Sequence, residues 1–114
     1  MAVFETSFLV DILRNHSGAL TLLRELEISE HSFFVAAPTI MELWGGALKS
    51  KKPVTAKLAV EQILSALDVL PLDSKTAKRA ADIQVELSRK GAKIETEDVM
   101  IAGITMANGE TLVT

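Results

Sequence analysis

The hydrophobic positions along the chain alternate between short apolar runs and longer stretches with helical spacing. The short runs predict buried strands at residues 2–4, 32–37, 69–72 and 111–114. Apolar side chains that repeat every three or four residues predict helices between these strands. The first helix starts at Thr6 or Ser7, and the others cover 20–28, Pro38 to Leu48, 56–67, Asp73 or Ser74 to Gly91, and Thr96 to Asn108. Short strands that alternate with helices predict an α/β domain with a mostly parallel sheet.

A parallel sheet would bring three distant acidic residues to one edge, because strand carboxyl ends and helix N-termini gather there. Glu5 follows the first strand, and Glu42 is expected in the first turn of the helix after the second strand. Asp98 is expected in the first turn of the helix before the last strand. Converging carboxylates repel one another and shift one another's pKa values. A hard cation such as Mg²⁺ or Mn²⁺, which prefers oxygen ligands, would relieve that repulsion.

Each acid also has a simpler interpretation. Thr39 and Glu42 have the T-x-x-E spacing of a capping box. Asp98 in a first turn suits the helix dipole whatever else it does. Glu5 could face solvent at a strand end. From the residues alone, a metal site, helix-end electrostatics and an unrelated small α/β binding domain all stay open.

Composition narrows the class of protein. A chain of 114 residues fits one domain, and the absence of cysteine excludes a disulfide scaffold and a thiolate metal site. The net charge of -3 gives no sign of a general polyanion binder. The apolar fraction of 48% and mean hydropathy of +0.28 favour an apolar oligomer interface. Glu5 and Asp11 interrupt the N-terminal apolar run, so we expect no signal peptide, no membrane segment and a cytoplasmic protein.

Two local features suggest ligand contacts. Gly45 and Gly46 interrupt a helical pattern, which costs helix stability and indicates either close packing or access for a ligand. The basic connector with Lys49, Lys51 and Lys52 is usually a solvated loop, although it could contact a phosphate backbone.

Three segments together resemble a known family. FETSFLVDILR, PTIMELWGGAL and IETEDVMIAGITMANGETLVT are similar to the three sequence motifs of PIN-domain proteins, in the order and spacing of VapC-type toxins from toxin–antitoxin pairs. The resemblance covers essentially the whole chain. It implies a PIN-like three-layer α/β/α domain with a short, mostly parallel central sheet.

The resemblance also implies an activity and a set of site residues. It implies a metal-dependent ribonuclease that uses an acidic pocket to bind Mg²⁺ or Mn²⁺ and hydrolyses RNA phosphodiesters. Glu5, Glu42 and Asp98 take the acidic, metal-binding positions. Thr6 takes the hydroxyl position beside the first acid, where it would help to orient that carboxylate or a metal-bound water. Proteins of this type commonly form homodimers and are silenced by a cognate antitoxin protein.

The chain departs from the family pattern in two places. The family usually has aspartate where this chain has Glu5, and one extra CH₂ moves the carboxylate oxygens by roughly 1 Å. The family also continues past L-V-T into a segment with a fourth acid and a last strand. We therefore expect residues 1–114 to form a single, C-terminally truncated PIN-like domain that lacks this strand. The alternative is a catalytically impaired PIN module that acts through dimerisation or antitoxin binding.

Overall fold

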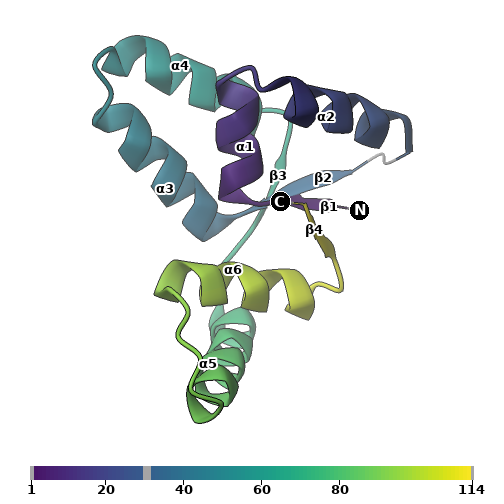
Figure 1. The fold of residues 1–114 in the computed structure, drawn as a ribbon, viewed down its shortest axis with the longest axis vertical. Helices are drawn as coiled ribbons and strands as arrows, with labels where there is room; N and C mark the ends of the chain where they lie inside the picture. The colour runs from purple at the N-terminus through teal and green to yellow at the C-terminus, as the bar shows by residue number, and fades with distance from the viewer. Residues whose placement is uncertain (1, 30–31, 114) are drawn as a thin grey trace.

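The sheet has the parallel arrangement that the sequence predicts. The computed structural model describes residues 2–29 and 32–113, and Thr114 of the predicted last strand lies outside them. Within them, the strands are β1 (Ala2–Phe4), β2 (Phe33–Ala36), β3 (Asp68–Leu70) and β4 (Thr111–Val113). Their order is β3-β2-β1-β4, and each neighbouring pair is parallel (Figure 1). The α/β class with a short parallel sheet is therefore confirmed.

Helices cover both faces of this sheet. They are α1 (Thr6–Leu13), α2 (Ser17–Ser29), α3 (Ala37–Leu48), α4 (Pro53–Leu64), α5 (Ser74–Arg89) and α6 (Thr96–Ala107). Figure 1 shows α1 to α4 on one side of the sheet and α6 on the other, with α5 beyond α6. The three-layer arrangement is confirmed, and α5 lies outside it. In the described part of the chain, none of these helices combines the length and the apolar character that a membrane crossing requires.

Several element boundaries differ from the predicted ones. Helix α4 starts at Pro53 rather than at residue 56, because proline is well tolerated in the first turn of a helix. It ends at Leu64 rather than at residue 67. Strand β3 begins at Asp68, before the predicted residue 69. At α5 the cap prediction is confirmed: Asp73 accepts a hydrogen bond from the Thr76 backbone N–H at 2.9 Å, and the Thr76 hydroxyl accepts one from the Asp73 N–H at 2.8 Å.

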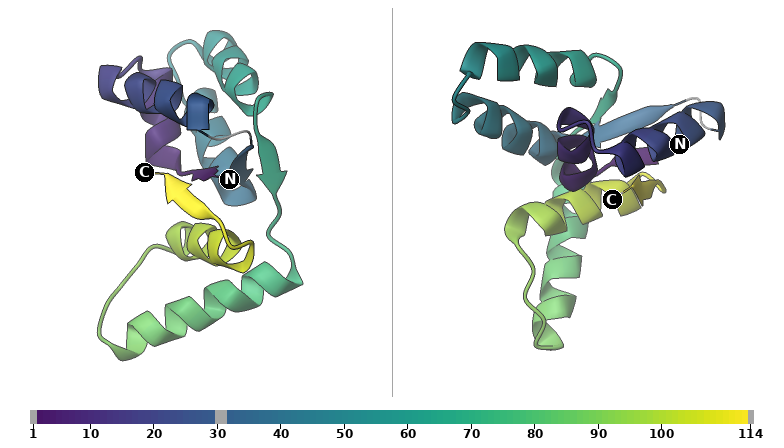
Figure 2. Two further views of the ribbon diagram at one scale, coloured as in Figure 1. Left: turned by 90° about the vertical axis from the view of Figure 1, so that its right-hand side faces the viewer. Right: turned by 45° about the horizontal axis from the view of Figure 1, so that its top comes forward.

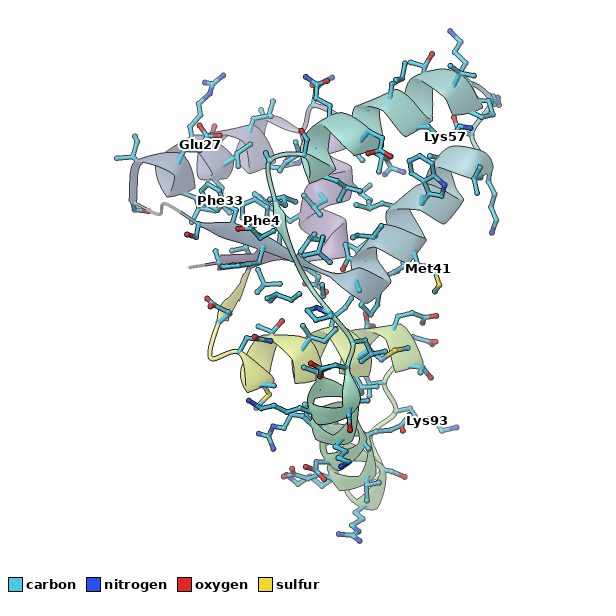
Figure 3. All side chains as sticks on the ribbon, turned by 180° about the vertical axis from the view of Figure 1, so that it is seen from behind. Phe4, Glu27, Phe33, Met41, Lys57 and Lys93 are labelled. Atoms are coloured by element: carbon cyan, nitrogen blue, oxygen red, sulfur yellow. The ribbon has the colours of Figure 1, made fainter. Side chains whose placement is uncertain are left out.

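The two central strands carry the core. Val3 on β1 and Val35 on β2 are fully buried, as expected for apolar runs covered on both faces. On the face of α1 to α4, the Phe4 ring lies 5.0 Å from Phe8 and 5.1 Å from Phe33 between ring centroids, and Figure 3 shows Phe4 beside Phe33. These packed rings fix the end of β1, and Glu5 is the next residue.

Helix α5 is attached to the domain through α6. A Cβ atom added to Gly103 of α6 would lie 2.7 Å from the backbone nitrogen of Ala80 on α5. The glycine therefore allows a close crossing that any side chain would obstruct. Figure 2 shows the two helices meeting near the start of α5 and separating towards the connection from residue 90 to 95.

Candidate acidic active site

Glu5 is held by its backbone at the carboxyl end of β1. Its N–H donates a 2.8 Å hydrogen bond to the carbonyl of Val113 on β4, and its own carbonyl accepts one of 3.2 Å from the Leu9 N–H. Glu5 is the N-cap residue of α1, without a side-chain capping bond. Its carboxylate therefore starts from a fixed point and is free for other interactions.

Glu42 reaches the same edge from α3, but one turn later than expected. The helix starts at Ala37, so Glu42 is its sixth residue and lies in the second turn rather than the first. The capping-box interpretation of Thr39 is also wrong, because the N-cap residue is Ala36. Thr39 is instead fully buried inside the helix packing.

The Thr6 hydroxyl joins α1 to α3. It donates a 2.9 Å hydrogen bond to Oε1 of Glu42, and its oxygen lies 3.3 Å from the hydroxyl oxygen of Thr39. The resemblance implies that Thr6 orients the first acid, Glu5, or a metal-bound water, and in the structure its hydroxyl contacts the second acid, Glu42. The Thr6 hydroxyl thus restrains the exposed carboxylate of Glu42 and also contacts the buried Thr39.

Asp98 lies in the first turn of α6, as predicted. The pKa of Glu5 is raised above its ordinary value, first because the carboxyl is partly buried and then because the negative charges of Asp98 and Glu42 are close. The pKa of Glu5 thus responds to the negative charges of both other acids. The convergence of all three carboxylates into one site stays a prediction. Helix-end electrostatics would account for Asp98 alone and not for this mutual repulsion.

The donor chemistry of these acids fits a hard divalent cation. Among residues 2–29 and 32–113, no three acidic or histidine side chains are close enough to hold one ion together. Mg²⁺ usually keeps several waters and binds through one or two carboxylates, so a complete protein cage is not needed. The repulsion that raises the pKa of Glu5 is what a bound cation would remove. The roles of Glu5, Glu42 and Asp98 as metal ligands stay predictions.

Two hollows adjoin the acids. One, of about 420 Å³ between α1, α3 and α4, is lined by Thr6, Glu42, Arg14 and Gly46 among others. A Cβ atom on Gly46 would have no neighbour within 4 Å, so close packing does not explain this glycine, and open access does. The other hollow is lined in part by Asp98.

Sequence reasoning alone does not identify Arg14 as part of the hollow beside Thr6 and Glu42, because no local pattern links Arg14 to Glu42.

The chain is similar to known proteins over nearly its whole length. The family pattern described as PIN domain matches residues 2–114. The tRNA(fMet)-specific endonuclease VapC of Shigella flexneri is 28% identical over 98% of this chain and 83% of its own length. The protein of the same name from Salmonella typhimurium is 39% identical over 70% of this chain and 61% of its own length.

A solved structure extends the similarity to three dimensions. The crystal structure of VapBC2 from Rickettsia felis, bound to a DNA fragment from its promoter, contains a chain that superposes with a TM-score of 0.90 at 25% identity. The match covers 99% of this chain and 85% of that one. The interpretation as an unrelated binding domain is therefore wrong, and the expected resemblance to VapC-type proteins is confirmed. This chain belongs to the PIN domain family.

Proposed function

We propose that this protein is a metal-dependent endoribonuclease of the toxin type, which hydrolyses RNA phosphodiesters with Mg²⁺ or Mn²⁺. The observation that carries the proposal is that the negative charges of Asp98 and Glu42 raise the pKa of Glu5 at the carboxyl edge of a parallel sheet. Ligands of open α/β sheets bind at this edge. The relatives named VapC endonucleases, from Shigella flexneri and Salmonella typhimurium, support the same reaction class.

The side chains would divide the work as follows. One or two of the carboxylates of Glu5, Glu42 and Asp98 would hold the cation together with waters. When bound, the cation supplies a more acidic water and compensates charge on the phosphate. Thr6 holds Glu42 in one orientation through its 2.9 Å hydrogen bond. The Glu5 backbone is anchored between β1 and β4, so its carboxylate stays directed at the same edge. Preorganised groups of this kind lower the barrier because they need no rearrangement during the reaction.

The direct test measures RNA cleavage by the wild-type protein with Mg²⁺ or Mn²⁺. The same assay is run with EDTA, which removes the metal, and with the variant Asp98→Asn, which removes one acid. A matched control is Asp82→Asn, which changes an exposed aspartate of α5 in the same way. We expect cleavage by wild type and Asp82→Asn, and none with EDTA or Asp98→Asn. Cleavage that persists in Asp98→Asn would contradict the assigned site.

A second readout does not depend on turnover. Calorimetric titration with Mn²⁺ should show binding to wild type and weaker binding to Asp98→Asn. If metal binds but no RNA is cleaved, the catalytically impaired alternative replaces the proposed activity. If neither metal binding nor cleavage is found, the acids do not form a metal site.

We also propose two protein partners, a cognate antitoxin and a second copy of this chain. The Rickettsia felis structure has a VapBC complex as its subject, which supports the first. Exposed apolar side chains support self-association: Val54 and Leu58 on α4 are 71% and 67% exposed, and Met41 on α3 is 63% exposed. Light scattering after size-exclusion chromatography, with and without the co-expressed partner, measures both. A monomer that binds no partner would contradict these proposals.

A further inference from the structure

A second hollow lies beside Asp98, and its other lining residues are not among the proposed cation ligands. It has a volume of about 520 Å³ and is open to solvent, because its lining residues are all exposed. Gln84 and Ser88 of α5, the connection through Lys93 and Ile94, and Asp98 of α6 contribute to its lining. It therefore shares Asp98 with the acidic site, and the rest of its lining comes from α5 and the connection to α6.

The lining offers hydrogen bonds that the protein itself does not use. Gln84 and Ser88 are four residues apart on α5, so they occupy neighbouring positions on one helix face. Both side chains can donate and accept. In the described part of the chain, neither side chain has a hydrogen-bond partner within the protein. The hollow thus presents adaptable polar groups to whatever enters it.

The lining also contains two apolar side chains. Ala92 and Ile94 belong to the connection between the helices, and Ile94 is 39% exposed although it is a large aliphatic side chain. A lining that mixes polar and apolar groups suits a nucleobase, which has a hydrogen-bonding edge and apolar faces.

Charge decides between a base and a phosphate. Glu95 and Asp98 give the lining two negative charges against the one positive charge of Lys93, so an anion inside the hollow would on balance be repelled. A neutral base meets no such penalty. Lys93 extends outward from the connection, on the same side of the molecule as Met41 in Figure 3. From there its ammonium group can contact a backbone phosphate outside the hollow.

We propose that this hollow binds one nucleobase of the RNA, next to the cleaved phosphate, and that Gln84 and Ser88 read its edge. The proposal rests on the proposed ribonuclease function and adds a determinant of sequence preference to it. The hollow shares Asp98 with the acidic site, so a base bound here belongs to a nucleotide close to the scissile bond.

The test compares the double variant Gln84→Ala/Ser88→Ala with wild type on RNA substrates that differ at single positions. We expect wild type to prefer particular bases near the cleavage site and the double variant to lose roughly 5–30-fold of that preference, through KM more than kcat. A matched control is Gln62→Ala/Ser65→Ala, which removes the same two residue types from exposed positions at the end of α4. That control should keep the wild-type preference.

Binding measured without turnover separates this proposal from the proposed activity. Fluorescence anisotropy with the same RNA series, in the Glu42→Gln background, should show the same loss of base preference in the double variant. If wild type cleaves no RNA but this binding preference is present and lost in the double variant, the base site is supported and the activity is not. If the double variant keeps the wild-type preference, or wild type has none, the base site is wrong.

Discussion

The Thr6 hydroxyl donates a 2.9 Å hydrogen bond to Oε1 of Glu42, although the two residues are 36 positions apart in the chain. The bond joins the first residue of α1 to the second turn of α3. Glu42 is otherwise an exposed side chain with several rotatable bonds. The hydroxyl therefore selects one orientation of the carboxylate before any ligand arrives.

Replacing Thr6 by valine should impair RNA cleavage without unfolding the protein. Valine keeps the branched shape but cannot donate a hydrogen bond to Glu42. A displacement of a catalytic group by about 1 Å can lower the rate roughly 100-fold. We expect kcat/KM to fall about 10–100-fold in Thr6→Val. Thr6→Ser, which keeps the hydroxyl, should retain most activity. Equal rates for Thr6→Val and wild type would show that this bond does not position Glu42.

Thr39 should act on the same carboxylate through Thr6. Its hydroxyl is fully buried and lies 3.3 Å from the Thr6 oxygen. This contact is long, so we expect Thr39→Val to change the free energy of unfolding by less than about 1 kcal/mol. Cleavage should nevertheless fall roughly 2–10-fold, with recovery in Thr39→Ser, if the hydroxyl restricts Thr6. Urea unfolding and kcat measured on the same samples separate the two effects; a loss of stability with unchanged kcat would make Thr39 purely structural.

The raised pKa of Glu5 predicts a pH dependence of stability in the metal-free protein. A raised pKa means that the folded state binds the proton more tightly than the unfolded state does. Stability from this group is thus complete below the ordinary value of 4.5 and is lost as pH rises through the raised pKa. Glu5→Gln removes the ionisation, so in EDTA this variant should gain stability over wild type as pH increases.

Thermal unfolding between about pH 4 and pH 8 measures this difference. Glu25→Gln, at an exposed position of α2, serves as the control for a lost surface charge. A constant difference between Glu5→Gln and wild type across the whole range would mean that Glu5 is not destabilised by its neighbours.

Shortening Glu5 should improve the site. The Glu5 N–H is bonded to Val113 at 2.8 Å, so the backbone cannot easily retreat to accommodate the extra CH₂. Mg²⁺ demands near-ideal octahedral geometry, and aspartate would place the carboxylate on a shorter and stiffer stem. We expect Glu5→Asp to raise kcat/KM, by up to about 100-fold. A lower rate in Glu5→Asp, with unchanged folding by circular dichroism, would show that the pocket is built around glutamate.

Gly103 and Gly45 should respond oppositely to alanine. Alanine at Gly103 would place its Cβ 2.7 Å from the backbone of Ala80, so α5 would have to move, at a cost of about 1–3 kcal/mol. Gly45 lies inside α3 with nothing within 4 Å of a Cβ, so Gly45→Ala should stabilise by about 0.5–1 kcal/mol. Urea denaturation of both variants gives the comparison. A stable Gly103→Ala protein would mean that α5 does not need this close crossing.

Local pattern alone determined the fold class and the position of the acids along the chain. Apolar runs such as residues 2–4 can be satisfied only by burial on both faces, which favours a parallel sheet covered by helices. A parallel sheet then fixes which ends of its elements share an edge. Glu5 and Asp98 could therefore be predicted from sequence to lie at the starts of helices, where the structure places them.

Tertiary packing decided what those residues contact. The spacing of Thr39 and Glu42 fits a capping box, yet the helix starts earlier and the Thr39 hydroxyl packs against Thr6 instead. The hollow with Gln84 and Ser88 depends on how α5 crosses α6 at Gly103. Such contacts join residues that are distant in sequence, and hydrophobic periodicity carries information about burial but none about which buried or exposed groups meet across helices.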